Sequence, residues 1–487
     1  MRIVILGAGQ VGGNLAENLV AENYDITVVD RDQERLAHLQ DRLDLQTVAG
    51  NAAHPSVLAN AGLNDADLMI AVTRSDQTNL VACKVAQSLF NVPTRIARLR
   101  AMDFQDNEKL LAKENFAVDY ALCPEQIITE HLARLVDFPE ALQVLTFGGG
   151  RLALVGVRAQ SGGNLIGRRI KQMGSDLPAG VDGRIAAIYR RDMAILPTGE
   201  TVINHGDEVF ALAAEEHIRI VMRELRRSIE PVRRVMIAGA GNVGLRLARA
   251  LESKCEVKLV ELDQRRAELV ADSLKSVLVL RGDTTDQNVL TQESIESMDL
   301  FFALTNRDED NIMAATLAKR MGCQRVVALI NRRAYAELVQ GGPIDIAISP
   351  AQLSISALLT YVRRGDVAQV HSLRHGAAEA FEIVAHGDEK NSKVIGRRIR
   401  DLPVINGAFI AAIMRDGERH GGTSPPALAR QKRIGPVLIA HKDAVIEPED
   451  HVLVFCVDKK VVKEVEKLFS PSASISSEES PCGAITR

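Results

Sequence analysis

An internal duplication constrains this 487-residue chain more than any other feature of its sequence. The segment RIVILGAGQVGGNLAENL, at residues 2–19, recurs 232 residues later as RVMIAGAGNVGLRLARAL, at residues 234–251. The same displacement carries Thr73 onto Thr305. Chance similarity does not keep one register over such distances, so the chain holds two copies of one design.

A second, smaller unit is also repeated, because LIGRRI at residues 165–170 matches VIGRRI at residues 394–399. The order along the chain is therefore A, B, A′, B′. The predicted domains are A at 1–125, B at 140–225, A′ at 232–352 and B′ at 368–469. We expect B′ to carry an insertion at 418–436 that forms a loop, and the Ser-rich residues 470–487 to form a disordered tail.

The two kinds of unit differ in their sequence pattern. The A units alternate short β-branched runs, such as ITVVD and LMIAV, with segments of helical period, which predicts a parallel βαβ sheet. The B units contain short strands broken by Gly and Pro, such as GRIAAIYR and DEVFALA, and are predicted to be small α+β domains.

A glycine-rich segment follows the first predicted strand of each A unit and opens a helix, as in dinucleotide-binding folds. Gly7 permits the tight turn, Gly9 lets the backbone approach a pyrophosphate, and Gly12 allows close helix packing. The segment consists of Gly7, Ala8, Gly9, Gln10, Val11 and Gly12, and the matching positions include Gly239, Gly241, Asn242, Val243 and Gly244. The fold class is therefore two Rossmann-like, doubly wound parallel-sheet domains, each followed by a small α+β domain.

An acidic residue stands at the end of the next strand in each copy. Asp30 follows the last glycine of the first motif by 18 residues, and Glu261 follows that of the second by 17. A carboxylate at this place accepts hydrogen bonds from the ribose hydroxyls and repels a 2′-phosphate, so NAD is favoured over NADP.

Loops after the third and fourth strands should line the same crevice. We expect Asn51 to face the base, and Thr73 and Asp76 to face the sugar. Their counterparts are Asp283, Thr305 and Asp308. An alternative interpretation assigns both threonines to the N-caps of the helices that follow.

Two arginines of the first copy, Arg98 and Arg100, are candidate phosphate ligands. The second copy has Leu329 and Asn331 at about these positions, with Arg332 and Arg333 only beyond them. We therefore expect the two sites to differ in ligand or affinity.

Composition excludes several classes of function. Lys and Arg total 59 against 63 Asp and Glu, and the net charge of -4 gives no general attraction to nucleic acid or anionic lipid. The chain has no Trp and only 3% aromatic residues, which argues against base stacking. No segment is long and apolar enough to suggest a membrane span, and the six cysteines form no C-x-x-C pair, so we expect a cytosolic chain with reduced thiols.

A catalytic set is not evident. The sequence has no Walker loop, nucleophile elbow or H-E-x-x-H motif, and no acid–base pair suited to hydride transfer. His371 and His375 lie four residues apart on a predicted strand, about 13 Å from each other, so a metal site is not predicted. We expect the chain not to be an enzyme.

The alternating order of units and several segments resemble the peripheral subunits of bacterial Trk potassium-uptake systems. These segments are GAGQVGGNLAENL, VTRSDQTNLVAC, NIMAATLAKRMG, RRAYAELVQG and IDIAISPAQLSISALL, and the similarity covers residues 1–469. In that family the A and B units form domains that regulate the conductance of potassium (RCK domains). The 418–436 insertion and the tail inherit no role from it.

The resemblance implies a homotetrameric ring, peripheral on the cytoplasmic face of the inner membrane. It also implies a separate membrane-embedded subunit that translocates potassium, and NAD(H) and ATP or ADP as regulatory ligands instead of substrates. The glycines of the two motifs would hold phosphate, and Asp30 and Glu261 would hold ribose.

Two other classes of function compete with this one. An NAD-dependent oxidoreductase with an unidentified substrate is disfavoured by the missing acid–base set. A redox-sensing transcription regulator would need a basic DNA-reading element, and neither the charge nor the sequence provides one.

Overall fold

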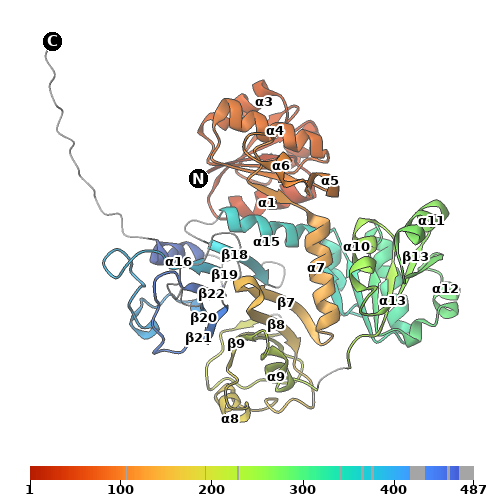
Figure 1. The fold of residues 1–487 in the computed structure, drawn as a ribbon, viewed down its shortest axis with the longest axis vertical. Helices are drawn as coiled ribbons and strands as arrows, with labels where there is room; N and C mark the ends of the chain where they lie inside the picture. Colours follow the sequence, from red (N-terminus) through yellow and green to blue (C-terminus); the bar gives the residue numbers. More distant parts are fainter. Residues whose placement is uncertain are drawn as a thin grey trace, which may run out of the picture.

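The computed structural model describes residues 1–105, 107–191, 193–227, 230–339, 342–362, 367–373, 378–416, 434–457 and 461–470. Figure 1 shows four domains in the order that the duplication predicts, with the second half coloured green to blue. Residues 471–487 of the predicted 470–487 tail and residues 418–433 of the predicted insertion lie outside the described residues, whereas Ser470 is described and follows the last helix. Residues 434–436, which we expected in that loop, instead begin strand β21 (Ile434–Ile439).

The first domain is a six-stranded parallel sheet in the order β3-β2-β1-β4-β5-β6. Its elements are β1 (Arg2–Leu6), α1 (Gln10–Val20), β2 (Asp25–Asp30), α2 (Gln33–Gln40), β3 (Gln46–Ala49), α3 (Pro55–Asn60), β4 (Leu68–Ala71), α4 (Asp76–Phe90), β5 (Thr94–Arg98), α5 (Met102–Gln105), α6 (Glu108–Leu111) and β6 (Tyr120–Leu122). The strand order reverses between β1 and β4, which opens a crevice at their carboxyl ends.

The second parallel-sheet domain repeats this order as β14-β13-β12-β15-β16-β17. Its elements are β12 (Arg234–Ala238), α10 (Asn242–Leu251), β13 (Glu256–Glu261), α11 (Gln264–Ser273), β14 (Leu278–Arg281), α12 (Gln287–Gln292), β15 (Leu300–Ala303), α13 (Asp308–Arg320), β16 (Arg325–Leu329), α14 (Arg333–Val339) and β17 (Ile346–Ile348). The predicted pair of Rossmann-like sheets is therefore confirmed.

Each small domain is a five-stranded antiparallel sheet. The first has the order β10-β9-β11-β8-β7, and the second has the matching order β21-β20-β22-β19-β18. The strands are β7 (Ala141–Phe147), β8 (Leu152–Arg158), β9 (Gly183–Arg190), β10 (Met193–Ile195), β11 (Glu208–Ala214), β18 (Val367–Leu373), β19 (Ala378–Val384), β20 (Ala408–Asp416), β21, and β22 (His451–Cys456), with helices α8 (Met173–Asp176), α9 (Ile218–Arg223) and α16 (Val462–Phe469).

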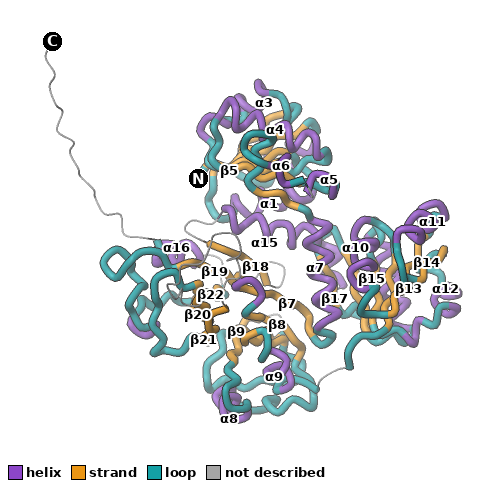
Figure 2. Tube along the Cα trace, viewed as in Figure 1, coloured by secondary structure: helices purple, strands orange, loops and turns teal. Residues whose placement is uncertain are grey.

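Two connecting helices cross from one half of the chain to the other. Helix α7 (Pro124–Asp137) leaves the first parallel sheet and packs against α10 of the second, whereas α15 (Pro350–Val362) leaves the second and packs against α1 of the first. Both views show this exchange, with α15 beneath the first domain and α7 beside α10 (Figures 1 and 2). Each parallel sheet therefore rests on a helix from the other half.

The hydrophobic cores follow this crossing instead of the order of the sequence. One core joins α7, the first small sheet and one face of the second parallel sheet. A second core joins the first parallel sheet, α15 and the second small sheet. The side chains of Leu132 on α7 and Leu358 on α15 are fully buried in these two cores. Burial of apolar surface, the main stabilising term in folding, thus binds the two halves together.

The two small sheets also share a core, which contains Phe147 and Phe210 from the first and Phe455 from the second. Polar contacts border it: the Gln143 amide donates to the Ser372 carbonyl over 3.1 Å, and the Arg184 guanidinium donates to the Ala440 carbonyl over 2.7 Å. The halves therefore meet as a pseudo-dimer within one chain. Among the described residues, no helix combines the length and apolar character needed to cross a bilayer.

Candidate nucleotide-binding site

The three glycines of the first motif have distinct structural duties at the turn between β1 and α1. Gly7 has φ +113°, and a Cβ there would lie 3.1 Å from the Thr73 nitrogen. A Cβ on Gly12 would lie 1.9 Å from the Gly7 carbonyl oxygen. Gly9 is the extended N-cap of α1, and no atom lies within 4 Å of a Cβ built on it. The first and third glycines therefore let the turn pack, and the second leaves open space at the helix N-terminus.

The second copy reproduces this turn between β12 and α10, whose first two residues are Asn242 and Val243. Gly239 has φ +98°, and a Cβ on Gly244 would lie 1.9 Å from the Gly239 carbonyl oxygen. Space around Gly241 is open, as it is around Gly9.

The predicted ribose ligands already bind the backbone of their own turn. One Asp30 carboxylate oxygen accepts from the Ala8 N–H over 2.6 Å, and the other accepts from the Asp32 N–H over 3.0 Å. Glu261 does the same, accepting from the N–H groups of Ala240 and Asp263 over 2.8 and 3.0 Å. Each carboxylate oxygen has a second lone pair for a ribose hydroxyl, so the carboxylates fix the loop and stay available.

The loop after β4 is held by an asparagine that the sequence analysis missed. Asn79 is fully buried, and its Oδ1 accepts from the Thr73 hydroxyl over 2.6 Å while its amide donates to the Arg98 carbonyl over 2.8 Å. The alternative that Thr73 caps the next helix is wrong, because Ser75 is the N-cap of α4 and accepts from the Thr78 N–H. The spacing of Thr and Asn in VTRSDQTN was the available signal.

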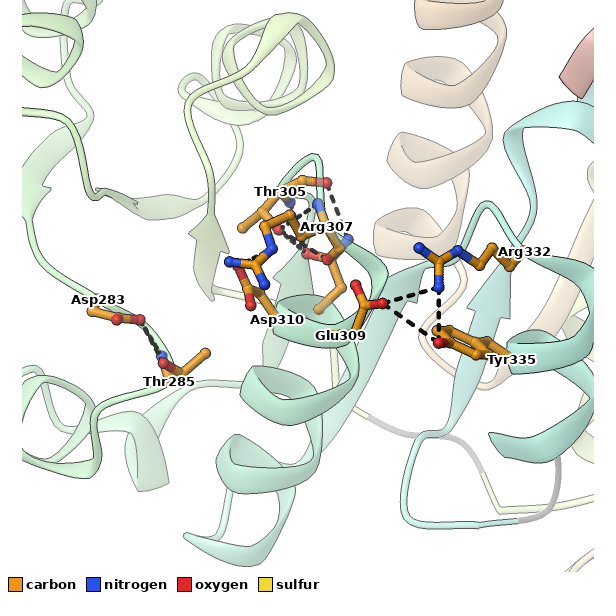
Figure 3. A network of polar contacts seen from close by, with 9 residues as sticks. Asp283, Thr285, Thr305, Arg307, Glu309, Asp310, Arg332 and Tyr335 are labelled. Atoms are coloured by element: carbon orange, nitrogen blue, oxygen red, sulfur yellow. Dashed lines mark hydrogen bonds and ion pairs between the residues drawn. The ribbon is translucent and has the colours of Figure 1, made fainter. Parts of the chain in front are cut away.

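Asn311 repeats this network in the second copy, where it bonds to the Thr305 hydroxyl over 2.7 Å and to the Leu329 carbonyl over 2.9 Å. The N-cap of α13 is Arg307, so the capping alternative is also wrong for Thr305. Figure 3 shows Thr305 and its neighbours at this loop.

Asp76 begins α4, which follows β4, and Asp308 begins α13, which follows β15. Their carboxylates face the loops after the next strands, β5 and β16. The Asp76 carboxylate accepts from the N–H groups of Arg100 and Ala101, both over 2.9 Å. The Asp308 carboxylate accepts from the N–H groups of Asn331 and Arg332 over 2.9 and 2.8 Å. The Asp76 contacts join the segment after β4 to the loop after β5. The Asp308 contacts join the segment after β15 to the loop after β16 in the same way.

Asn51 and Asp283 each close a short turn. Asn51 Oδ1 accepts from the Ala53 N–H over 3.1 Å, and Asp283 Oδ1 accepts from the N–H of Thr285 over 2.8 Å (Figure 3). Asn51 also lies 3.1 Å from the His54 ring nitrogen.

Most of the predicted residues of the first copy line one cavity of about 950 Å³. They are Gly7, Ala8, Gly9, Gln10, Val11, Asp30, Asn51, Thr73, Arg98 and Arg100. Gly12 and Asp76 are not among its lining residues, since Gly12 packs beneath the turn and Asp76 faces the neighbouring loop. The cavity lies in the size range of small-molecule sites.

Arg98, one of several arginines that line this cavity, has no carboxylate within hydrogen-bond distance among the described residues. The Arg98 side chain is 15% exposed, and its Nη2 lies 3.9 Å from a Glu125 carboxylate oxygen, too far for a hydrogen bond. Burial, and next the charge of Arg100, lower the pKa of Arg98. A phosphate beside the guanidinium would offset both effects.

Part of the first cavity is built from the second half of the chain, which the sequence analysis did not foresee. Asn331 and three residues of the first turns of α15, Pro350, Ala351 and Ser354, line it together with the glycine turn. The crossing of α15 creates this contact. No local pattern reports a contact between residues that lie more than 300 positions apart.

The second crevice differs at the position of Arg98. Strand β5 pairs Ala97 with Ala71, and β16 pairs Ala328 with Ala303, which places Leu329 where the first copy has Arg98. The register thus confirms that leucine stands in place of this arginine, and a difference in ligand or affinity between the two sites stays a prediction. Two of the arginines nearby are paired with carboxylates, Arg307 with Asp310 at 3.6 Å and Arg332 with Glu309 at 3.0 Å (Figure 3).

Family models match most of the chain. A model described as the TrkA-N domain matches residues 3–124 and 235–350, and one described as the TrkA-C domain matches residues 154–226. Two relatives are each described as a Trk system potassium uptake protein TrkA. The one from Vibrio alginolyticus is 50% identical over 97% of this chain and 99% of its own, and the one from Halomonas elongata is 50% identical over 96% and 98%.

Solved structures share the fold at low identity. The GsuK RCK domain has a TM-score of 0.58 at 18% identity, covering 96% of this chain and 94% of that chain. The GsuK channel bound to NAD has a TM-score of 0.58 at 17% identity, covering 96% and 78%.

Proposed function

The chain belongs to the TrkA family of Trk system potassium uptake proteins, regulatory subunits of potassium transport, and we propose that it couples nucleotide binding to potassium conduction by a separate membrane-embedded subunit. The observation that carries this proposal is the first crevice, where the glycine turn of one half faces the start of α15 from the other. A nucleotide bound there touches both halves of the chain at once.

Coupling follows from this shared wall. Helix α15 contacts α1 and α7 and packs against β18 of the second small domain. A ligand that holds α15 closer to the glycine turn favours one arrangement of the halves over another, provided that it binds the two arrangements unequally. A shift from 1:99 to 99:1 needs about 5.5 kcal/mol of differential affinity, which several sites in one assembly can share.

The first crevice is proposed to bind NAD(H), with ATP or ADP as further regulatory ligands. Open space at Gly9 and the N-terminus of α1 suit a pyrophosphate, Asp30 suits ribose hydroxyls and disfavours a 2′-phosphate, and Arg98 suits a phosphate oxygen. The likeness to the GsuK channel bound to NAD supports this assignment. The second crevice, with Leu329 in place of Arg98, is proposed to prefer a different nucleotide or affinity.

The assembly is proposed to be a homotetrameric ring, peripheral on the cytoplasmic face of the inner membrane beneath its potassium-translocating partner. The nucleotides act as effectors, and the chain is proposed to catalyse no reaction on them. The residues that face the first cavity suit binding and orientation of a nucleotide. His38 is the histidine among the described lining residues, and its ring nitrogen lies 3.5 Å from the Arg42 guanidinium instead of pairing with a carboxylate as hydride transfer would need.

Initial potassium uptake in cells that lack this chain tests the proposal. The cells are resupplied with the wild type, Gly9→Val or Gly241→Val. Both glycines have ordinary φ values and open surroundings, so valine fits the fold but fills the space kept for phosphate. We expect the wild type to restore uptake and each valine variant to restore less, because each variant blocks nucleotide binding at one of the two sites.

Gly174→Val is the matched control, because Gly174 on α8 also has open surroundings and lies outside both crevices. Uptake by this variant should equal that of the wild type. Equal uptake by all four chains, or turnover of NADH with a carbonyl substrate, would overturn the proposal.

A further inference from the structure

A second cavity, of about 780 Å³, lies between the first parallel-sheet domain and helix α10 of the second. Its first wall is the start of α4 with the loop after β5, and its second wall is one face of α10. Arginines project from both walls: Arg74 and Arg100 from the first, and Arg246 and Arg249 from the second. We call this cavity the arginine groove.

Few carboxylates balance these four charges. Asp76 is the one acidic side chain among the described lining residues, and the N–H groups of Arg100 and Ala101 bind one of its oxygens. Arg246 donates to the Gln126 side chain over 3.0 Å, a neutral partner. In the part of the chain that the structure describes, Arg74 and Arg249 are exposed and no ion pair to either is formed.

Glu125 lies on α7, next to Gln126, which lines the groove. Its carboxylate lies 3.9 Å from the Arg100 Nε, beyond hydrogen-bond distance, and equally far from Arg98. One carboxylate is thus divided between two guanidinium groups, and the groove keeps a net positive charge.

The duplication supplies an internal comparison. The pseudo-equivalent junction, between α1 and the loops of the second parallel sheet, contains none of these four arginines. Asn306 replaces Arg74, Asn331 replaces Arg100, Asn14 replaces Arg246 and Glu17 replaces Arg249. The alignment of Arg100 with Asn331 follows from their N–H groups, which bind Asp76 and Asp308 respectively.

The pseudo-equivalent junction has two arginines of its own, and each of these has its own carboxylate within 3.6 Å. Arg307 and Arg332 are paired with Asp310 and Glu309, as Figure 3 shows. The pseudo-equivalent junction therefore carries paired charges together with polar and acidic side chains. The arginine groove, on the same scaffold, carries four arginines with few carboxylates near them. Both junctions pack equivalent elements against each other, so packing does not explain why their charged side chains differ.

We propose that the arginine groove binds a small phosphate-bearing anion that bridges the two parallel-sheet domains. The planar guanidinium group donates two parallel hydrogen bonds to phosphate, and four such groups on facing walls repel one another unless an anion lies between them. Phe104 and Leu245 add apolar surface, and the volume suits a small molecule. This site is separate from the glycine turns and does not depend on the function proposed above.

The groove adjoins the first nucleotide crevice. Arg74, Ser75 and Arg100 line both cavities. An anion in the groove therefore changes the charge that a nucleotide phosphate meets in the crevice, so that the two sites influence each other's affinity.

Titration calorimetry of the purified full chain with inorganic tripolyphosphate tests the site. The informative variant is Arg246→Asn/Arg249→Glu, which installs the residues of the pseudo-equivalent junction on α10. We expect tripolyphosphate affinity to fall at least tenfold in this variant. Arg223→Asn/Arg320→Glu is the control, since it makes the same charge change at two exposed positions outside the groove; its affinity should stay within twofold.

Two further arms separate the groove from the crevices and identify the source of the phosphate. Gly9→Val/Gly241→Val should keep tripolyphosphate binding, and a loss there would overturn the proposal by placing the anion at the glycine turns. Equal affinity in the two arginine variants, or no tripolyphosphate binding by the wild type, would also overturn it.

Loss of one ATP equivalent in Arg246→Asn/Arg249→Glu would identify a nucleotide as the source, and an unchanged number of ATP equivalents would identify free polyphosphate. Thermal unfolding of each variant confirms its fold.

Discussion

At two of the three motif positions the fold itself needs glycine, and at the third, Gly9, the proposed ligand needs it; experiments on single variants separate these two roles. The close approach at Gly12 is to a backbone carbonyl, which has no rotamer by which to retreat. At Gly9 the neighbouring volume is solvent. Loss of binding in a Gly9 variant is therefore interpretable, whereas loss in a Gly12 variant reports on folding.

Gly12→Ala should lower the free energy of unfolding by about 3 kcal/mol or more, because the new methyl group overlaps the Gly7 carbonyl. Gly9→Ala should cost less than about 1 kcal/mol, the difference between Gly and Ala at an N-cap. Denaturant titration of both variants measures this, and equal midpoints would contradict the geometry.

Asn79→Asp should destabilise the first domain by about 3 kcal/mol and weaken nucleotide binding in its crevice. The new carboxylate is buried against the Arg98 and Thr73 carbonyls, to which the amide now donates. Asn311→Asp should destabilise the second domain similarly and spare the first crevice. Thermal unfolding and NAD titration of the two variants distinguish these outcomes; identical NAD affinities would refute the assignment.

At the level of elements, α7 and β18 carry two half-buried histidines, His131 and His371. Burial lowers the pKa of His131 and of His371 to about 4. The charges of His371 and then Arg134 lower the pKa of His131 further, by smaller amounts. For His371, a hydrogen bond from its ring to the Thr146 backbone raises the pKa, Arg134 lowers it, and Glu382 raises it. The ring of His371 meets Phe147 edge-on at 5.0 Å.

Stability should therefore fall in acid. A histidine whose folded pKa is depressed binds fewer protons in the folded than in the unfolded state between pH 6.5 and 4, so its contribution is complete above pH 6.5 and is lost as the pH falls. The expected loss is about 2 kcal/mol per histidine at pH 5 relative to pH 8. Unfolding of the wild type and His371→Gln over this range measures it; a pH dependence that is unchanged in the variant would contradict it.

At the level of the whole molecule, the crossing of α7 and α15 makes the two halves interdependent. The Arg325 guanidinium on β16 donates to the carbonyls of Pro139 and Ala141, and the Lys463 ammonium on α16 donates to the Glu22 carbonyl. Each small domain is thus attached to the parallel sheet of the other half by polar contacts as well as by a shared core.

Cleavage of the chain between Arg227 and Glu230 should leave the fragments together. A protease site inserted there yields two halves whose separation would expose the cores centred on Leu132 and Leu358. We expect one species in size-exclusion chromatography and one thermal transition after cleavage, as for the uncut control. Separate elution of the halves would show that the crossing does not stabilise the chain.

Much of this architecture could be predicted from the sequence. The displacement of 232 residues, the short β-branched runs and the glycine motifs predict the parallel sheets, and the residues of the first motif other than Gly12 do line one cavity. The pairing of Asp76 with the loop after β5 could not be predicted, because a capping or sugar-binding acid has the same spacing. The crossing helices also left no signal, since α7 and α15 have the same apolar stripe whichever half they cover.

The interlocked pseudo-dimer also bears on how such a molecule diverges. Two identical subunits would place any new arginine at both junctions, and a ligand gained at one would be gained at the other. Joining the copies in one polypeptide fixes their pairing at one to one, and each junction can then accumulate its own substitutions. Arg246 and Asn14 stand at matched positions and differ in this way: after the gene duplication, the two contacts that were once symmetric can change independently.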